Sequence, residues 1–268
     1  MNKYLSFFRL RFVNSLQYRS AAFAGIATQF FWGLMELLLF SAFYRAGDTA
    51  ALPMRFDQLA SYIWLQQALL ALFMTWYFDG EILDAVVTGA VAYELCRPAD
   101  LYAMWFAKGL AVRTSRALLR FAPILLAAAL LPPPFRLGPP VSLPAALLFL
   151  LSTAMGLCVI VAFSMLIYIS AFYTVSPLGV RMLAASVMEF FTGALLPLPF
   201  FPEALQPIFY ALPFASMQST PFLIYTGYMR GREALLGLLV QAVWLLLLVV
   251  LGRLWMRRAV RRTVVQGG

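Results

Sequence analysis

The sequence predicts an all-α integral membrane protein with six transmembrane helices, and three observations support this prediction. Hydrophobic residues make up 63% of the 268-residue chain and charged residues only 12%, a balance that a soluble domain of this size could not bury. Apolar runs of roughly 20 residues recur, which is about the length that crosses a bilayer as a helix. The runs are continuous rather than alternating, which argues against the strands of a membrane barrel.

The N-terminal segment, residues 1–20, is expected to form an interfacial amphipathic helix on the inner leaflet. Phe8 and Phe12 lie on one helical face, whereas Arg9 and Arg11 lie outside it. Aromatic side chains interleaved with basic ones are typical of a helix that binds an anionic lipid surface. The alternative is a solvated basic tail that only sets the orientation of the chain.

The spans are separated by short polar or proline-rich turns. Residues 99–116 are expected to form an inner-surface helix carrying Lys108 and Arg113, and this helix leads into the third span, where Pro123 predicts a kink. The prolines of residues 132–144 then exclude helix. The six expected spans cover residues 21–44, 59–78, 117–131, 145–172, 182–196 and 233–254.

A second unusual stretch, residues 197–225, precedes the last span. It is too apolar for an ordinary loop and too rich in proline for one continuous span. Irregular backbone at membrane depth is tolerated only where protein covers it. We therefore expect short re-entrant helices on the extracytoplasmic side.

The distribution of basic residues predicts the orientation. With both termini, residues 79–120 and the turn at 173–181 on one side, that side holds 15 of the 20 basic residues. Basic residues collect on the cytoplasmic side of membrane proteins. Both termini are therefore expected in the cytoplasm, and the net charge of +9 is explained by bilayer orientation rather than by nucleic-acid binding.

The segment at residues 79–98 is expected to be a short amphipathic helix under the membrane. It combines acidic residues with apolar residues at helical spacing, a mid-segment glycine that loosens or ends a helix, and an Arg-Pro pair whose proline suits the first turn of the next helix. Such a helix offers a docking surface. The residues that define it are Asp79, Glu81, Ile82, Asp84, Val86, Gly89, Arg97 and Pro98.

Two ionisable residues, Glu36 and Glu189, fall well inside expected spans. A carboxylate at that depth is costly and suggests a role in transport. The alternatives are that Glu36 bonds a neighbouring helix or subunit and that Glu189 lies nearer an interface. The chain has no histidine, two cysteines and no glycine-rich phosphate loop, so it offers neither a histidine-based catalytic site nor nucleotide hydrolysis of that kind.

The order of these features resembles a known family. Glu81-Ile82, Gly89 and Arg97-Pro98 form the pattern E-I-(x)6-G-(x)n-R-P, and the outer stretch between Pro197 and Phe214 is similar to the re-entrant region before the last span. Together with the six spans, they resemble the membrane (permease) subunit of type-2 ABC exporters. The subgroup is that of bacterial six-span permeases often encoded as a pair beside an ATPase.

The resemblance implies a mechanism and a set of partners. Two permease chains, related or identical, would face each other across a pathway in the bacterial inner membrane, and each would dock on a separate ABC ATPase through the coupling helix in residues 79–98. ATP and Mg would be bound by that ATPase, with no cofactor, metal or catalytic residue in this chain. The apolar spans favour an amphiphilic or lipid-like compound, or a drug, as cargo.

Two other classes of function stay open at this point. The first is a secondary, ion-coupled carrier that works alone. The second is a membrane-embedded lipid-modifying enzyme in which Asp79, Glu81 and Asp84 hold a metal.

Overall fold

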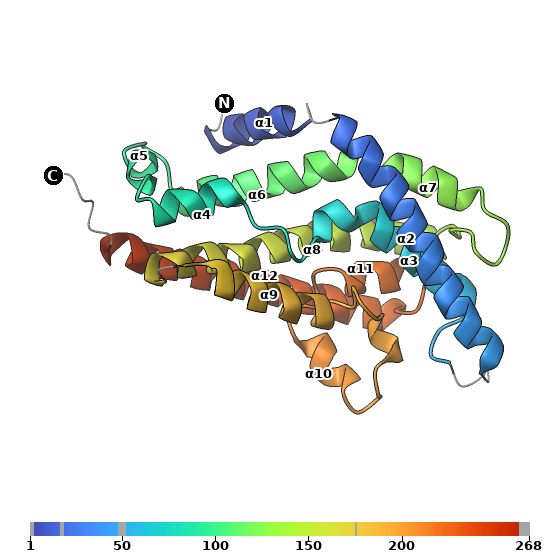
Figure 1. Cartoon of the computed structure of the whole chain (residues 1–268). Coiled ribbons are helices and arrows are strands. Elements are labelled where there is room, and N and C mark those ends of the chain that lie inside the picture. The colour runs from blue at the N-terminus through green and yellow to red at the C-terminus, as the bar shows by residue number, and fades with distance from the viewer. Residues whose placement is uncertain (1–2, 17–18, 48–51, 175, 263–268) are drawn as a thin grey trace.

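A computed structural model describes residues 3–16, 19–47, 52–174 and 176–262, and within these ranges the chain is helical without strands. The long helices lie side by side in an elongated bundle, with α4, α5 and the end of α12 gathered at one end (Figure 1). The elements are α1 (Lys3–Ser15), α2 (Arg19–Ala46), α3 (Phe56–Phe73), α4 (Gly80–Val87), α5 (Val91–Leu95), α6 (Leu101–Leu118), α7 (Phe121–Ala129), α8 (Leu143–Ser170), η2 (Ala171–Tyr173), α9 (Leu178–Phe191), η3 (Leu198–Phe200), α10 (Gln206–Ala211), α11 (Ser219–Tyr225) and α12 (Gly231–Arg262).

Three helical stretches of the described chain are long and apolar enough to cross a membrane. They are Ala24–Ala46, Leu143–Tyr173 and Gly231–Arg261. These stretches coincide with the expected first, fourth and sixth spans, and the last helix continues through the basic tail. The other three expected spans fall on shorter helices, so six crossings stay a prediction.

The expected span at 59–78 is wrong at its C-terminal end, because α3 stops at Phe73. Its last carbonyl groups are bound by Arg113 of α6: the guanidinium donates to the carbonyl oxygens of Leu72 and Met74, each at 3.0 Å. A helix leaves its last four carbonyls without partners. Because a buried cation from another helix supplies the missing donors, the chain leaves α3 here and continues without regular structure to α4.

The expected span at 117–131 is divided in the structure. The chain turns at Leu119 and Arg120, between α6 and α7, so Pro123 lies in the first turn of α7 rather than at a kink inside one long helix. In a first turn the missing N–H of proline costs no hydrogen bond, and this explains why the break precedes the proline.

Pro98 is also displaced from its expected place. Helix α6 begins at Leu101, and Asp100 caps it by accepting a hydrogen bond from the backbone N–H of Ala103 at 2.7 Å. An aspartate at this position satisfies an otherwise unpaired donor. Pro98 therefore lies before the helix, in the connection from α5. The helix expected over residues 99–116 is present as α6, although its Lys108 and Arg113 side chains are buried within the chain; its place at the inner membrane surface stays a prediction.

The expected span at 182–196 is shifted toward the N-terminus, since α9 covers Leu178–Phe191. Gly193 follows two residues after the end of α9, and the φ of +79° at this glycine is a left-handed conformation that side chains with a Cβ disfavour. A Cβ at this glycine would also meet the Tyr62 hydroxyl at 2.9 Å. The glycine therefore ends the helix and admits close packing on α3.

The stretch at 197–225 has the form that its prolines predict. It folds into η3, α10 and α11, three short helices joined by turns. Residues 219–224 of α11 are all buried, and this helix packs against α8. Protein therefore covers the α11 part of this broken backbone, as a re-entrant segment requires, whereas most of residues 202–208 before and within α10 are exposed. Its location on the extracytoplasmic side stays a prediction.

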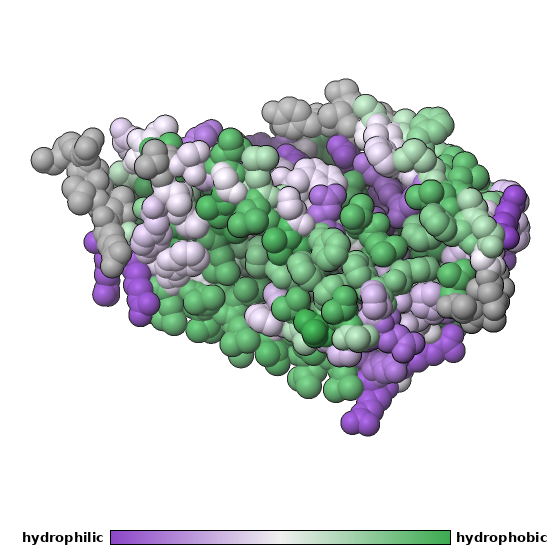
Figure 2. All heavy atoms as spheres, turned by 60° about the horizontal axis from the view of Figure 1, so that its bottom comes forward, coloured by the Kyte–Doolittle hydropathy of each residue, from purple (hydrophilic) through white to green (hydrophobic). Residues whose placement is uncertain are grey.

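The outer surface of the bundle is largely apolar. Figure 2 shows a broad hydrophobic face with hydrophilic side chains gathered toward its ends. A continuous apolar surface of this kind indicates contact with lipid or with another chain. Exposed residues of α12 contribute Leu235, Leu239, Val243, Leu246, Val250 and Leu254.

Helix α1 confirms a helix within the expected segment 1–20, whose residues 1–2 and 17–18 lie outside the described part of the chain. It lies along α6 (Figure 1). Phe8 and Phe12 are half-buried and stacked, with ring centroids 5.8 Å apart, and Arg9 is exposed. Its contact with a lipid surface stays a prediction.

Candidate functional site

The first part of the candidate site begins at a close crossing of α2 and α3. Gly33 makes this crossing possible, because a Cβ there would lie 2.8 Å from the Trp64 ring and 3.1 Å from the Gln67 side chain. Glu36 lies one turn further along α2, where Gln67 Nε2 donates a hydrogen bond to its carboxylate at 3.2 Å. The missing side chain at Gly33 therefore brings two polar groups together among apolar helices.

A cavity of about 620 Å³ opens at this crossing and is walled by α2, α3, α9 and the chain that follows α9. Glu36 and Glu189, which the sequence singled out separately, both line it. Glu36 is half-buried and hydrogen-bonded across the helix pair, and Glu189 is exposed. The complete lining is Gln29, Trp32, Met35, Glu36, Leu39, Phe40, Phe43, Gln66, Gln67, Leu70, Trp76, Glu189, Ala194, Leu195 and Leu196.

Sequence reasoning missed the glutamines of this cavity. Gln66 and Gln67 are both buried in the wall, and Gln66 Nε2 donates to the carbonyl of Ala194 at 2.7 Å. The amide oxygen of Gln66 has no hydrogen-bond partner among the described residues, although buried polar atoms normally have one. A pair of adjacent glutamines in an otherwise apolar run was the signal that could have identified them.

The chemistry of the cavity is mixed. Most of its wall is aliphatic or aromatic, its polar groups are amides and carboxylates, and no basic side chain lines it. Ligand cavities typically combine an apolar wall with a few polar groups that fix orientation. This cavity suits a molecule with an apolar body and a polar or positively charged group.

The second part of the candidate site is the segment at 79–98, which begins at an ion pair. Asp79 is the N-cap of α4, where its carboxylate accepts a hydrogen bond from the backbone N–H of Ile82 at 3.3 Å. The Lys108 ammonium lies 2.9 Å from the same carboxylate, and the Asp79 backbone N–H donates to the Tyr168 hydroxyl at 2.9 Å. The start of α4 is thus attached to both α6 and α8.

Glu81 extends this network to the N-terminal helix. Its carboxylate lies 2.7 Å from the Lys108 ammonium and 3.1 Å from the Arg11 guanidinium. The hydrogen bond from Lys108 lowers the pKa of the Glu81 carboxyl below its usual value, because an adjacent cation favours the charged form. Arg11 was expected to contact lipid. The structure directs it to the acidic segment instead.

Part of the apolar face of α4 is buried against the bundle. Ile82 and Leu83 are almost fully covered, in the same cluster of buried side chains as Trp105 of α6, and Val86 is half-buried. Trp105 Nε1 also donates to the Glu94 carboxylate at 2.6 Å, which attaches α5 to α6. The two short helices therefore form a rigid unit on the end of the bundle.

The opposite face of this unit is open. Asp84, Arg97 and Pro98 are exposed, as are Val87 at 51% and Tyr93 at 79%. Exposed aromatic residues are enriched at protein interfaces. Tyr93 was not singled out in the sequence, although its aromatic ring amid an acidic surface segment was a usable signal, and Val87 was placed on the apolar face of the helix with Ile82 and Val86. Asp79 and Ile82 were assigned to docking, but both are buried within this chain.

Gly89 separates the two helices of the unit. Its φ is +78°, and nothing lies within 4 Å of the position that a Cβ would occupy. Its backbone N–H donates to the carbonyl of Val86 at 3.3 Å, which ends α4 in the left-handed conformation common after helices. The glycine is therefore required by its backbone conformation and not by a lack of space.

Arg113 connects the two parts of the site. Besides the carbonyls at the end of α3, its guanidinium donates to the carbonyl of Tyr77 at 3.1 Å, and its side chain is buried. The connection from α3 to α4 is thereby held at several points by one side chain of α6. A displacement of α4 would consequently reach α3, whose glutamines line the cavity.

These features define a helical, multi-pass membrane protein with a largely apolar cavity that carries a few polar groups, and with a surface helix pair at one end. The family described as ABC-2 family transporter protein matches residues 30–267, and the chain belongs to this family. It is therefore a membrane component of an ABC transporter, a class that is generally non-catalytic. No match is found among curated proteins.

Proposed function

We propose that this chain is the permease subunit of an ABC exporter that moves an amphiphilic or lipid-like compound, or a drug, across the bacterial inner membrane. A second permease chain, related or identical, would complete the pathway. A separate ABC ATPase, which binds ATP and Mg, would dock on the open face of α4 and α5. Both termini would lie in the cytoplasm, in keeping with the distribution of basic residues.

The arrangement around Arg113 is the observation that best supports this proposal. A transport subunit without its own nucleotide site needs a stiff connection between the surface that receives motion and the cavity that holds cargo. Arg113 binds three carbonyl groups between Leu72 and Tyr77, and Lys108 holds the start of α4. A connection held at several points transmits displacement, whereas a mobile loop would absorb it.

The lining of the α2–α3–α9 cavity supports the proposed cargo. Trp32, Phe40 and Phe43 offer an apolar aromatic wall, and Glu36 and Glu189 offer carboxyl groups. An apolar body would bury against the rings and a polar or cationic group would face the carboxylates. We expect such a compound to bind better than a sugar or an inorganic ion.

Co-purification of the ATPase tests the docking surface. Two single variants in the open face of α4 and α5, Asp84→Arg and Tyr93→Asp, would each be expressed with the ATPase of the same transporter and purified alongside the wild type. We expect both variants to lose the ATPase while keeping the thermal unfolding temperature of the wild type. Glu203→Gln, an exposed acidic residue outside this face, is the matched control. Retention of the ATPase by both docking variants would contradict the proposal.

Reconstitution in vesicles separates this function from the carrier. We expect uptake of a fluorescent amphiphile to require both the ATPase and ATP. Transport by the purified chain alone, driven by an ion gradient, would support a secondary carrier instead. The enzyme hypothesis is not favoured by the geometry, because Lys108 already holds both Asp79 and Glu81.

A further inference from the structure

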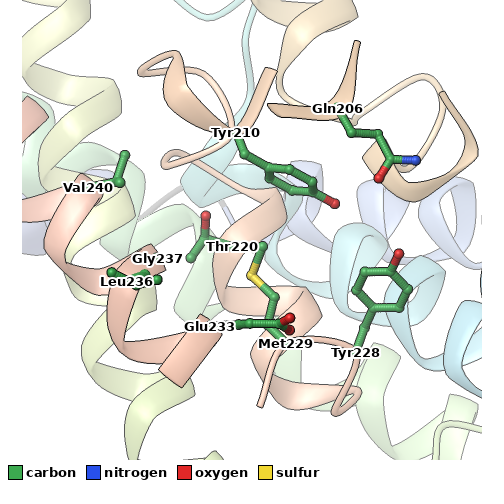
Figure 3. Close-up of a pocket in the computed structure, with 9 residues that line it drawn as sticks. All are labelled: Gln206, Tyr210, Thr220, Tyr228, Met229, Glu233, Leu236, Gly237 and Val240. Atoms are coloured by element: carbon green, nitrogen blue, oxygen red, sulfur yellow. The ribbon is translucent and has the colours of Figure 1, made fainter. Parts of the chain in front are cut away.

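A second cavity of about 350 Å³ lies where α10, α11 and α12 meet (Figure 3). It shares no lining residue with the α2–α3–α9 cavity. It is formed by the short helices before the last span and by the first turns of α12. Its lining is Gln206, Tyr210, Thr220, Tyr228, Met229, Glu233, Leu236, Gly237 and Val240.

Polar groups converge in this cavity without satisfying one another. The Tyr210 hydroxyl oxygen is buried and has no hydrogen-bond partner among the described residues. In Figure 3 it points toward the side occupied by Gln206 and Tyr228, and the Tyr228 hydroxyl points toward Gln206. An unpaired buried hydroxyl is costly, so this group indicates a site that an additional molecule completes.

The free polar atoms in this cavity are mainly acceptors. Gln206 Nε2 already donates to the carbonyls of Pro199 and Phe201, at 3.0 and 2.8 Å, which leaves its amide oxygen. Thr220 donates to the carbonyl of Ala215 at 3.1 Å. Glu233 contributes a carboxylate that makes no ion pair with any residue in the described ranges.

Positive charge is absent from the lining. Two arginines, Arg230 and Arg232, are close to Glu233 in sequence, and neither lines the cavity. Arg230 donates from Nε to the carbonyl of Gly227 at 2.6 Å. An anionic ligand would therefore find a carboxylate and no cation. A metal ion would find only one carboxylate, fewer charged oxygens than Ca²⁺ sites usually offer.

We propose that this cavity binds an organic ammonium group, either primary or quaternary. Glu233 would balance the positive charge, and the rings of Tyr210 and Tyr228 would attract it through their negative faces, as aromatic residues do in sites for quaternary ammonium ligands. Met229, Leu236 and Val240 would contact the methyl or methylene groups. This binding is separate from the proposed transport function, and its test requires neither the ATPase nor transport.

The ammonium group has two possible sources, a zwitterionic lipid headgroup or a free organic amine. Leu235 and Leu239 of α12 are exposed beside the cavity, so an acyl chain could lie along this helix with its headgroup at Glu233. A free amine would enter without such a chain. The two sources share the same recognition chemistry and differ in their dependence on lipid composition.

Calorimetric titration of the purified chain with choline tests the site. The neutral isostere 3,3-dimethylbutanol has the same shape without the charge. We expect choline to bind and Glu233→Gln to weaken it by about tenfold or more, with little binding of the isostere. Tyr228→Leu should weaken binding more than Tyr228→Phe, which keeps the ring. Glu203→Gln, outside the lining, is the matched control and should bind as the wild type does.

The lipid source is distinguished in nanodiscs. If a lipid headgroup is the natural occupant, the ammonium group of phosphatidylethanolamine should compete with choline, so choline should bind more weakly in nanodiscs of this lipid than in nanodiscs of phosphatidylglycerol. If the natural ligand is a free amine, choline should bind equally well in both. Equal affinity for choline and its neutral isostere, or unchanged binding in a well-folded Glu233→Gln variant, would overturn the proposal. The isostere comparison uses only wild-type protein, so it decides the matter even where a variant fails to fold.

Discussion

The Lys108 ammonium lies 2.9 Å from a carboxylate oxygen of Asp79, and the two side chains are only 7% and 11% exposed. The same carboxylate caps α4. One buried acidic group therefore both begins the surface helix and attaches it to α6. Asp79 acts inside the chain, as an anchor for the coupling segment, and the residues left to meet a partner are those on its open face.

Replacement of Lys108 by Met should destabilise the protein strongly. It would leave Asp79 buried without its cation, and loss of one partner of a buried ion pair costs about 3–5 kcal/mol. We expect a loss of about that size in the free energy of unfolding, measured by denaturant titration in mixed micelles.

The double variant Asp79→Asn with Lys108→Met is the informative control. It removes both charges, so it should be more stable than Lys108→Met alone. Arg97→Ala, at an exposed position of the same segment, should change the free energy little. Equal stability of Lys108→Met and the wild type would show that the pair does not anchor the helix.

The contribution of Glu81 should depend on pH. Its pKa lies below the ordinary value of 4.5, so the charged form is favoured in the folded state. The stabilisation is fully present above 4.5 and is lost as the pH falls through the lowered folded-state value. We expect the difference in unfolding temperature between the wild type and Glu81→Gln to shrink from neutral pH toward about pH 3. Arg97→Ala, at an exposed position of the same segment, is the control, and its difference should stay constant over this range.

Gly89 should tolerate side chains according to backbone conformation rather than size. At a φ of +78° with open space around it, Val should cost about 1–2 kcal/mol and Asn less. We expect Gly89→Val to uncouple ATP hydrolysis from transport in the reconstituted complex, and Gly89→Asn to keep much of the coupling. Gly80→Ala is the control, because that position is equally open and has no positive φ. Wild-type coupling in Gly89→Val would refute this role.

The apolar pattern was sufficient for the long helices and insufficient for the short ones. Helices α2, α8 and α12 match their expected spans because length and hydropathy alone identify them. The end of α3 depends on a guanidinium from α6, about 40 residues further along the chain. Local sequence does not contain that information, so the second span was drawn too long.

In the candidate site, too, the sequence identified features that are local and missed those that depend on tertiary packing. Glu36, Glu189 and the segment at 79–98 were found because charge is rare in such a chain. Their partners were not, since Lys108 meets Asp79 and Gln67 meets Glu36 through tertiary packing. Lys108 and Arg113 were expected on an inner-surface helix because basic residues recur over 108–120 at spacings that let most of them share a helical face. Both are in fact buried with partners.

A side chain at Gly33 should damage the cavity and leave docking intact. Val at this position would meet the Trp64 ring at 2.8 Å, so α2 must move away from α3 and the bond between Glu36 and Gln67 is lost. We expect transport to fall by about tenfold or more, as misplacement of a binding group commonly costs, with the ATPase still co-purifying. Gly47→Ala, near the end of α2 with only a 3.3 Å contact to its own helix, should transport normally. Full activity in Gly33→Val would contradict the proposed pathway.

The orientation of the chain can be checked at two exposed acidic positions. Asp84 on α4 and Glu203 before α10 are both open to solvent, so failure to label would report the side of the membrane and not burial. In a Cys96→Ser background, which removes the exposed native thiol, Glu203→Cys should react with an impermeant maleimide in intact cells. Asp84→Cys should react only after the cells are opened. The reverse pattern would invert the topology and place the α4–α5 surface where no cytoplasmic ATPase could reach it.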